Sequence, residues 1–244
     1  MRLTLVIPTL DERENLALLV PELLAGIPDL AELIVVDDGS SDGTQDLVRT
    51  WHARDRRLRL LERSPPPSLT AALRDGIAAA TGDTVGWMDA DRVIRVDDFV
   101  RLIDALKRGA DMAVASRFVA GGAIKALTRP GRDSSVEVVL SWSLNALLLP
   151  WLLGTGVHDY TSGIVVARRE ALERLVLRGH HGEYMIGLWL QADRAGLRVA
   201  ELGYRAQERV AGRSKTAASA RRLLAHGARY LGAALVARRA YRRE

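Results

Sequence analysis

The sequence predicts an α/β fold with a mostly parallel sheet, and three observations support this prediction. Over about the first 120 residues, short apolar runs alternate with longer stretches of helical periodicity. Leu33–Val36 is a continuous apolar, mostly β-branched run, as expected for a strand that is covered on both faces. Polar side chains follow directly after several of the runs. Alternating strands and helices indicate parallel strands with helices on both faces of the sheet.

The individual elements follow in order along the chain. Each expected strand is an apolar run, and the strands are Leu3–Pro8, Leu33–Asp38, Leu58–Leu61, Thr84–Met88 and Met112–Ala115. The expected helices fill the intervals between them, at Glu14–Leu24, Gly43–Trp51, Leu69–Ala80 and Asp97–Lys107. In such sheets, ligands bind beyond the carboxyl ends of the strands. The predicted fold therefore also predicts where a site should lie.

Composition sets the limits of the interpretation. A chain of 244 residues with 48% hydrophobic residues can bury a sizeable core, in one large domain or in a domain with an appendage. The absence of cysteine excludes a disulfide framework, a thiol nucleophile and a cysteine-ligated zinc site, and it fits a cytosolic protein. Met1-Arg2 leads directly into the first strand, so no signal peptide is expected. The net charge of +5 suggests polyanionic partners such as nucleotides, nucleic acid or an anionic membrane, although many arginines can also reflect genomic base composition.

Charged and polar side chains gather at the ends of three strands. These residues are Asp37 and Asp38, Asp89 and Asp91, and Ser116 and Arg117. Because parallel strands end at one edge of the sheet, we expect the three groups to converge. Alternation places Asp89 and Asp91 on one side of an extended backbone, where two carboxylates can hold Mg²⁺ or Mn²⁺ and, through it, a diphosphate. An Asp-x-Asp pair also occurs in solvated loops, so the pair alone does not decide.

The segment Gly39–Thr44 joins the second strand to the next helix. Its glycines allow a tight turn, and Asp42 or Thr44 can cap the helix. A helix start beside a diphosphate would also favour the negative charge. An ordinary turn explains the glycines but not the preceding Asp37-Asp38, whose carboxylates can hydrogen-bond a nucleoside.

Six motifs in order resemble those of family 2 glycosyltransferases with the GT-A fold. The first three are Val6-Ile7-Pro8-Thr9 with Glu12, Val36–Thr44, and Asp89-Ala90-Asp91. The later three, Ser116-Arg117-Phe118, Asp159–Gly163, and Arg209 followed by Gly212–Lys215, are similar to dolichol- or polyprenol-phosphate mannose synthases. The resemblance runs from about residue 3 to residue 216. It implies a catalytic domain over residues 1–216 and a metal-dependent, inverting transfer of a hexose, foremost mannose from GDP-mannose, to a polyprenyl or dolichyl monophosphate.

The resemblance also implies roles for particular residues. The expected catalytic residues are Asp89, Asp91, Arg117 and Asp159, with Mg²⁺ or Mn²⁺ on Asp89 and Asp91 as Lewis acid for the leaving group. The expected nucleotide-sugar site comprises Pro8, Leu10, Glu12, Val36, Asp37, Asp38, Asp89, Ala90, Asp91, Arg117, Arg209 and Lys215. The acceptor phosphate is expected at Arg132, Ser162 and Ser214, with Arg129 as a further candidate. For the basic residues, the alternative is a solvated charged surface.

The implied acceptor bears on proton transfer. A lipid monophosphate is already ionised near neutral pH, so it can attack without the general base that a hydroxyl acceptor needs. Asp159 would then orient groups near the acceptor, and its alternative role is to cap the turn before Thr161. The five histidines show no metal-ligand spacing, and we expect surface or loop positions for them.

Two stretches suggest contact with a membrane surface. Val136–Leu153 is mostly apolar, but its polar residues argue against a lipid-exposed span, so it is interpreted as an interfacial helix or as a buried core helix. Residues 217–244 contain a basic amphipathic helix suited to an anionic membrane, with docking to a partner or a second copy as the alternative. These features predict a cytoplasmic protein attached peripherally to the membrane, without a nucleic-acid partner.

Three departures from the family pattern qualify the resemblance. Leu10 stands where the family often has an aromatic residue, and Asp11 where it has Asn, which puts the nucleoside contacts in doubt. The segment Ser64–Ala72 lacks the usual glycines, and Val93 replaces an expected third metal ligand. Two alternatives therefore stay open. One is a family 2 transferase with another donor, such as UDP-glucose, or a non-lipid acceptor; the other is a catalytically silent scaffold.

Overall fold

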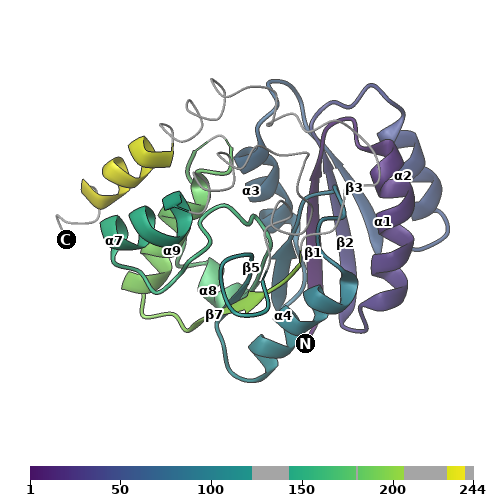
Figure 1. Cartoon of the computed structure of the whole chain (residues 1–244). Coiled ribbons are helices and arrows are strands. Elements are labelled where there is room, and N and C mark those ends of the chain that lie inside the picture. The colour runs from purple at the N-terminus through teal and green to yellow at the C-terminus, as the bar shows by residue number, and fades with distance from the viewer. Residues whose placement is uncertain (123–142, 180, 206–229, 240–244) are drawn as a thin grey trace, which may run out of the picture.

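The computed structural model describes residues 1–122, 143–179, 181–205 and 230–239, and the strands among them form one sheet (Figure 1). The strands are β1 (Leu3–Thr9), β2 (Leu30–Asp37), β3 (Leu58–Glu62), β4 (Thr84–Trp87), β5 (Met112–Ser116), β6 (Val165–Arg168) and β7 (Val199–Gly203). Their order is β3-β2-β1-β4-β6-β5-β7, and only β6 runs antiparallel to its neighbours within this sheet. The mostly parallel sheet that the sequence predicts is confirmed.

Helices cover both faces of the sheet, and each face has its own hydrophobic cluster. The first cluster includes residues of α1 (Arg13–Gly26), α2 (Thr44–His52) and α4 (Val96–Lys107). The second includes residues of α3 (Leu69–Ala79), α8 (Arg169–Leu172) and α9 (Tyr184–Arg194). The strands supply alternate residues to the two clusters, as the pleat requires. In β1, Leu5 and Ile7 belong to the first cluster and Val6 to the second.

One close approach fixes α3 on the sheet. A Cβ atom at Gly76 would lie 2.4 Å from a methyl carbon of Val6 and 2.9 Å from one of Val36. The absence of a side chain at Gly76 therefore lets the helix sit directly on β1 and β2. This packing holds the two strands whose ends carry the first polar turns of the site.

Strand β6 decides which later segment reaches the functional edge. Val165, its first residue, pairs with Trp87 near the end of β4 and with Val114 of β5. Because β6 is antiparallel, its beginning lies where its neighbours end. The residues just before it, Asp159–Gly163, therefore arrive at the same edge as the ends of β4 and β5. The sequence analysis did not predict β6 or β7.

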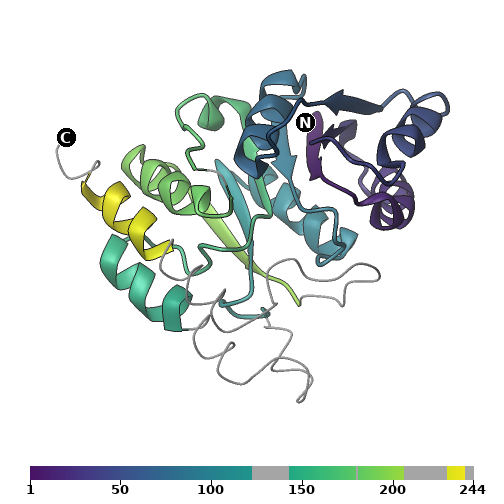
Figure 2. The same ribbon diagram turned by 90° about the horizontal axis from the view of Figure 1, so that it is seen from above.

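Two helical segments lie apart from the sheet, next to α9. A π-helix, η1 (Ser143–Leu148), continues into α7 (Leu149–Leu153), and residues 230–239 form a further helix. Figures 1 and 2 both show helix 230–239, in yellow, alongside α7. The expected helix Val136–Leu153 thus has its second part confirmed, while residues 136–142 and the expected domain boundary after residue 216 lie outside the described residues. In the described part of the chain, no helix is long and apolar enough to cross a membrane.

Candidate active site

The turns that follow β1 and β2 are joined by hydrogen bonds. The Asp11 carboxylate accepts from the Ser41 N–H at 2.8 Å, and the Asp11 N–H donates to Ser40 Oγ at 2.8 Å. Asp42 accepts from the Arg13 N–H at 2.9 Å and from Thr44, which begins α2. Asp11 has a φ of 55°, a left-handed conformation that Asp and Asn tolerate better than most residues. The replacement of Asn by Asp at this position therefore preserves the turn.

Asp37 and Asp38 face protein donors in this structure. Asp37 is fully buried, and it accepts from the Ser40 N–H at 2.9 Å and from Gln45 Nε2 at 2.6 Å. Asp38 pairs with Arg63 and accepts from the Ser68 N–H at 2.7 Å. Both carboxylates thus order the loops around the sheet edge. Their expected contact with the nucleoside stays a prediction.

The two carboxylates of the Asp-x-Asp pair leave the core on either side of Ala90. β4 ends at Trp87, so the pair lies in a turn rather than on the extended backbone that the sequence analysis assumed. Asp89 is exposed and Asp91 is half-buried, whereas Ala90 is 3% exposed and packs in the first cluster. Burial therefore still alternates along this turn: Ala90 packs in the core, and the carboxylates on either side of it are more exposed.

The same turn explains the missing third ligand. Val93 packs against the first hydrophobic cluster, and its N–H donates to the Asp91 carboxylate at 3.3 Å. Among the described residues, no group of three or more His, Cys, Asp or Glu side chains could hold a metal ion. Asp89 and Asp91 are thus the protein oxygen ligands that this turn offers, and both suit a hard divalent cation.

Arg117 and Asp159 form an ion pair at the same edge. Arg117 Nε and Nη2 donate to the two Asp159 oxygens at 3.0 and 2.9 Å, and the Arg117 N–H donates to Oδ2 at 3.1 Å. The Asp159 side chain is fully buried and that of Arg117 is 24% exposed. Arg117 also lies over the Phe118 ring, 5.4 Å from its centroid. Its guanidinium is therefore held in one orientation before any ligand binds.

Charge and burial compete at this pair. Burial alone would raise the pKa of Asp159, but the charge and hydrogen bonds of Arg117 outweigh it and hold that pKa below its ordinary value. For Arg117, burial would lower the pKa, and Asp159 raises it instead. Both groups are therefore charged at neutral pH. An ionised Asp159 whose two oxygens both accept hydrogen bonds from Arg117 fits the expected orienting role better than proton abstraction.

The loop that carries Asp159 is anchored on three sides. Asn145 of η1 is buried, and its Oδ1 accepts from the Tyr160 N–H at 3.1 Å. Glu201 of β7 accepts from the Asp159 N–H at 2.9 Å and also from the N–H and ring of His158. The third anchor is the Arg117 pair itself. The site thus depends on β5, β7 and η1, which are far apart in the sequence.

Glycine at 163 lets this loop approach the Asp-x-Asp turn. Gly163 has a φ of 67°, and a Cβ there would lie 3.9 Å from Asp89 Oδ2. The Asp89 carboxylate therefore lies next to Gly163, and the same loop binds Arg117 through Asp159, so this loop links the ends of β4 and β5. The expected convergence of these groups with Asp37 and Asp38 stays a prediction. The adjacent Ser162 is buried, and its hydroxyl has no hydrogen-bond partner within the described residues.

Three buried tyrosines that the sequence analysis did not assign to the site are influenced by its charges. Burial raises the pKa of Tyr204 to about 12, with Arg117 opposing and Asp159, Asp91 and Asp89 adding to the shift. Burial also raises the pKa of Tyr230, on helix 230–239, to about 12, and Glu183, Asp159 and Asp89 contribute. Tyr184 accepts from Trp87 Nε1 at 2.9 Å. Their spacing resembles that of core residues, so no sequence signal separates them from the core.

The remaining expected site residues divide into two groups. Pro8, Leu10 and Glu12 are partly exposed after or at the end of β1, whereas Val36 is fully buried, so only its backbone could contact a ligand. The other group lies outside the described residues, and it comprises Arg129, Arg132, Arg209, Ser214 and Lys215. Their expected roles stay predictions.

Comparison with known proteins gives concordant findings. A family model described as glycosyl transferase family 2 matches residues 4–176. A polyprenol monophosphomannose synthase of Mycolicibacterium smegmatis is 36% identical over 225 residues, which covers 89% of this chain and 82% of that protein. An undecaprenyl-phosphate mannosyltransferase of Micrococcus luteus is 30% identical, over 88% of this chain and 87% of its own.

A solved structure shares the fold. Glucosyl-3-phosphoglycerate synthase of Mycobacterium tuberculosis, crystallised with Mn²⁺, UDP and glucosyl-3-phosphoglycerate, matches with a TM-score of 0.69 and 22% identity. The match covers 97% of this chain and 79% of that one. It confirms the fold that the motifs implied.

Proposed function

Since the chain belongs to glycosyl transferase family 2, we propose that it transfers a hexose from a nucleoside diphosphate sugar to a polyprenyl monophosphate. The observation that carries this proposal is the loop Asp159–Gly163, which binds Arg117 through Asp159 and approaches the Asp89 carboxylate at Gly163. Carboxylates for a cation and a fixed guanidinium are the groups that a leaving diphosphate requires. A catalytically silent scaffold would have no use for such a set.

We propose that Asp89 and Asp91 hold Mg²⁺ or Mn²⁺. Their hard oxygens suit these ions, and the shell would be completed by the diphosphate and water because Val93 faces the core. The cation, when bound, neutralises charge on the departing nucleoside diphosphate. The Mycobacterium tuberculosis synthase that shares the fold was crystallised with Mn²⁺ and UDP, which supports a divalent cation here.

The reaction needs no protein base. An oxygen of the ionised acceptor phosphate attacks the anomeric carbon, the bond from that carbon to the diphosphate oxygen breaks, and its electron pair leaves with the nucleoside diphosphate. Direct displacement inverts the anomeric centre. We assign Arg117 to a phosphate, and Asp159 to the orientation of Arg117, because both stay charged at neutral pH. The unpartnered Ser162 hydroxyl can donate to the acceptor phosphate.

We propose mannose from GDP-mannose as the donor group and a lipid monophosphate as the acceptor. The names of the Mycolicibacterium and Micrococcus relatives support mannose and a polyprenol carrier. A third relative, a dodecaprenyl-phosphate galacturonate synthase of Rhizobium johnstonii, is 27% identical, so the sugar varies among related proteins. A cytoplasmic, peripheral membrane location would fit a lipid acceptor and a soluble donor.

The test is a donor and acceptor screen. Purified full-length protein is incubated with Mg²⁺ or Mn²⁺, a short polyprenyl phosphate, and in turn GDP-mannose, UDP-glucose or UDP-galacturonate. We expect a mannosyl lipid by mass spectrometry with GDP-mannose and little product with the others. Product from another donor would show that the proposed donor sugar is wrong. If no donor is consumed with any lipid phosphate, the proposed enzymatic activity is refuted. A matched reaction with a hydroxyl acceptor should give no product.

A further inference from the structure

The helical pair beside α9 carries the most exposed apolar side chains of the described residues. Trp151 of α7 is 79% exposed, and Leu147 of η1 is 56% exposed. On helix 230–239, Val236 is 68% exposed and Leu235 is 49% exposed. Both views place the two helices side by side (Figures 1 and 2), so these residues belong to one region of the surface. We call Leu147, Leu148, Trp151, Leu235 and Val236 the apolar face.

The inner sides of the same helices reach the core and the candidate site. On helix 230–239, Tyr230, Ala233, Ala234 and Ala237 pack on the second cluster, a spacing of one helical stripe. Tyr230 comes close to Gly182, where a Cβ would lie 2.5 Å from its hydroxyl oxygen. On η1, Asn145 bonds the backbone of the Asp159 loop at Tyr160. Each helix therefore joins an exposed apolar side to a side that touches the site.

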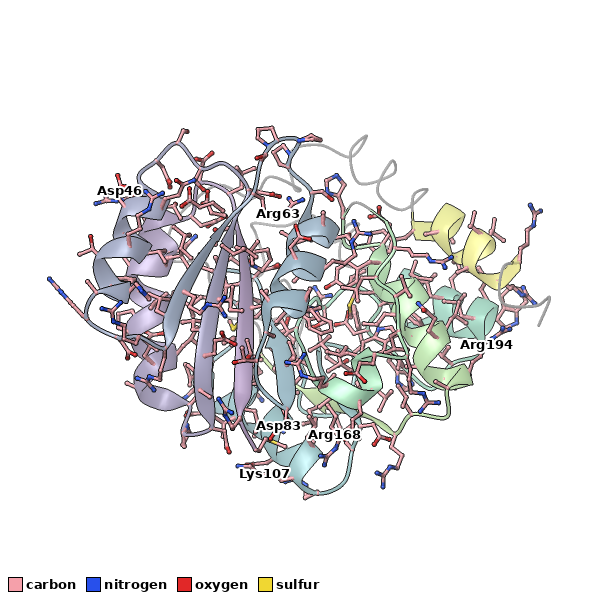
Figure 3. All side chains as sticks on the ribbon, turned by 180° about the vertical axis from the view of Figure 1, so that it is seen from behind. Asp46, Arg63, Asp83, Lys107, Arg168 and Arg194 are labelled. Carbon is pink, nitrogen blue, oxygen red and sulfur yellow. The ribbon has the colours of Figure 1, made fainter. Side chains whose placement is uncertain are left out.

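Positive charge borders the apolar face. Arg238 and Arg239 lie two and three residues after Val236 on the same helix, and Arg239 is exposed. Arg194, at the end of α9, lies on the same side of the molecule as helix 230–239 (Figure 3). The stretch from residue 221 to residue 243 contains no acidic residue, and its arginines are Arg221, Arg222, Arg229, Arg238, Arg239, Arg242 and Arg243. The charge of Arg194, Arg238 and Arg239 is complementary to an anionic lipid surface and gives no attraction between two copies of the face.

We infer that η1–α7 and helix 230–239 together form one docking face for an anionic lipid bilayer, which delivers the lipid phosphate to the Arg117–Asp159 pair. Tryptophan and leucine side chains bind the boundary between headgroups and acyl chains, and the arginines bind the anionic headgroups. The inference rests on the proposed function for the identity of the acceptor, but the face itself can be tested without sugar transfer.

The experiment measures vesicle binding of the full chain by flotation. Vesicles are made of phosphatidylcholine alone or of an equimolar mixture of phosphatidylcholine and phosphatidylglycerol. The double variant Trp151→Ser/Val236→Ser removes one apolar side chain from each helix. Leu18→Ser is the matched control, because Leu18 is 43% exposed on α1, at the opposite end of the molecule (Figure 1).

We expect the wild-type protein to float with the anionic vesicles. The vesicle-bound fraction of the double variant should be at least about tenfold lower than that of the wild type. Leu18→Ser should bind like the wild type, and all three proteins should react equally with a water-soluble short-chain prenyl phosphate. Equal vesicle binding by the double variant, or an equal loss in Leu18→Ser, would overturn the inference. So would a wild-type dimer without vesicle binding that the double variant converts to a monomer. Binding without any sugar transfer would instead refute only the proposed function.

Discussion

The loop region after β1 and β2 and the loop before β6 hold their polar groups in opposite ways. Asp11, Ser40 and Asp42 are fixed by partners in two adjacent turns, at sequence separations of about 30 residues. Asp159 instead depends on Arg117, Asn145 and Glu201, which come from three separate elements. The first region is therefore organised by the parallel strands and turns themselves. The second exists only once β5, β7 and η1 have packed.

This difference bears on how the two regions should respond to change. The turns of the first region share many hydrogen bonds, so a single substitution removes a small part of their stability. The Asp159 loop concentrates buried charge and buried amides, where a missing partner leaves another group unpaired. The second region also connects the site to the apolar face, whereas the first does not.

The largest effect is expected at Asp91, in the turn after β4, which belongs to neither region. Asp91→Asn removes a charged cation ligand, and we expect transfer to fall by about 10³-fold or more, or about 4 kcal/mol in the barrier. A chelator such as EDTA should abolish wild-type activity, and added Mg²⁺ or Mn²⁺ should restore it. The thermal midpoint should barely change, since Asp91 is only half-buried. Turnover within tenfold of wild type would argue against the cation site.

Asp159→Asn tests the buried pair of the second region through stability. We expect a loss of about 3 kcal/mol in the free energy of unfolding in urea at pH 7, because the Arg117 charge stays mostly buried without its counter-charge and keeps only neutral acceptors such as Thr161 Oγ1. The folded-state pKa of Asp159 lies below its unfolded value, which is about 3.9. Its contribution is therefore complete well above pH 3.9 and is lost as the pH falls through the folded value.

The difference between wild type and this variant should accordingly be constant from about pH 6 to pH 8 and shrink below about pH 4. Asp42 also has a lowered pKa, since the hydrogen bonds from Thr44 and Arg13 outweigh burial, so it gives a comparison in the first region. A difference that stays constant down to the acid transition would contradict the assigned charge state of Asp159.

Asn145→Ala separates the two sides of η1. The variant leaves the buried Tyr160 N–H without its acceptor, and we expect a loss of about 2 kcal/mol in stability together with a lower kcat. Vesicle binding should be unchanged, in contrast to variants of the apolar face. A variant of unchanged stability and kcat would show that Asn145 does not anchor the Asp159 loop.

The smallest effects are expected at Asp11, in the first region. Asp11→Ala loses hydrogen bonds and puts a residue that tolerates a φ of 55° less well at this position. We therefore expect the free energy of unfolding, measured by thermal unfolding, to fall by about 1 kcal/mol. Asp11→Asn keeps an acceptor oxygen and the tolerance of this conformation, so it should stay within about 0.5 kcal/mol of wild type. Equal losses in both variants would mean that the carboxylate charge, rather than the turn, matters here.

Sequence alone determined the first half of the fold. The five expected strands and four expected helices are all present, with ends that differ by a few residues, such as Leu33–Asp38 against Leu30–Asp37 for β2. These elements were predictable because periodicity and turn residues are local signals. Asp89, Asp91, Arg117 and Asp159 could be named because they stand in motifs that resemble a family.

Only the tertiary structure decided how these residues meet. β6 enters between β4 and β5 in the reverse direction, which brings Asp159 to Arg117 across 42 residues and Gly163 to Asp89. Tyr230 and Asn145 carry no motif, and their closeness to the site follows from helices that pack over long sequence separations. Such contacts depend on burial of apolar faces on a shared core, and that energy is not encoded in any single segment. The Asp-x-Asp pair could therefore be identified from the sequence, but the residues that surround it in space could not.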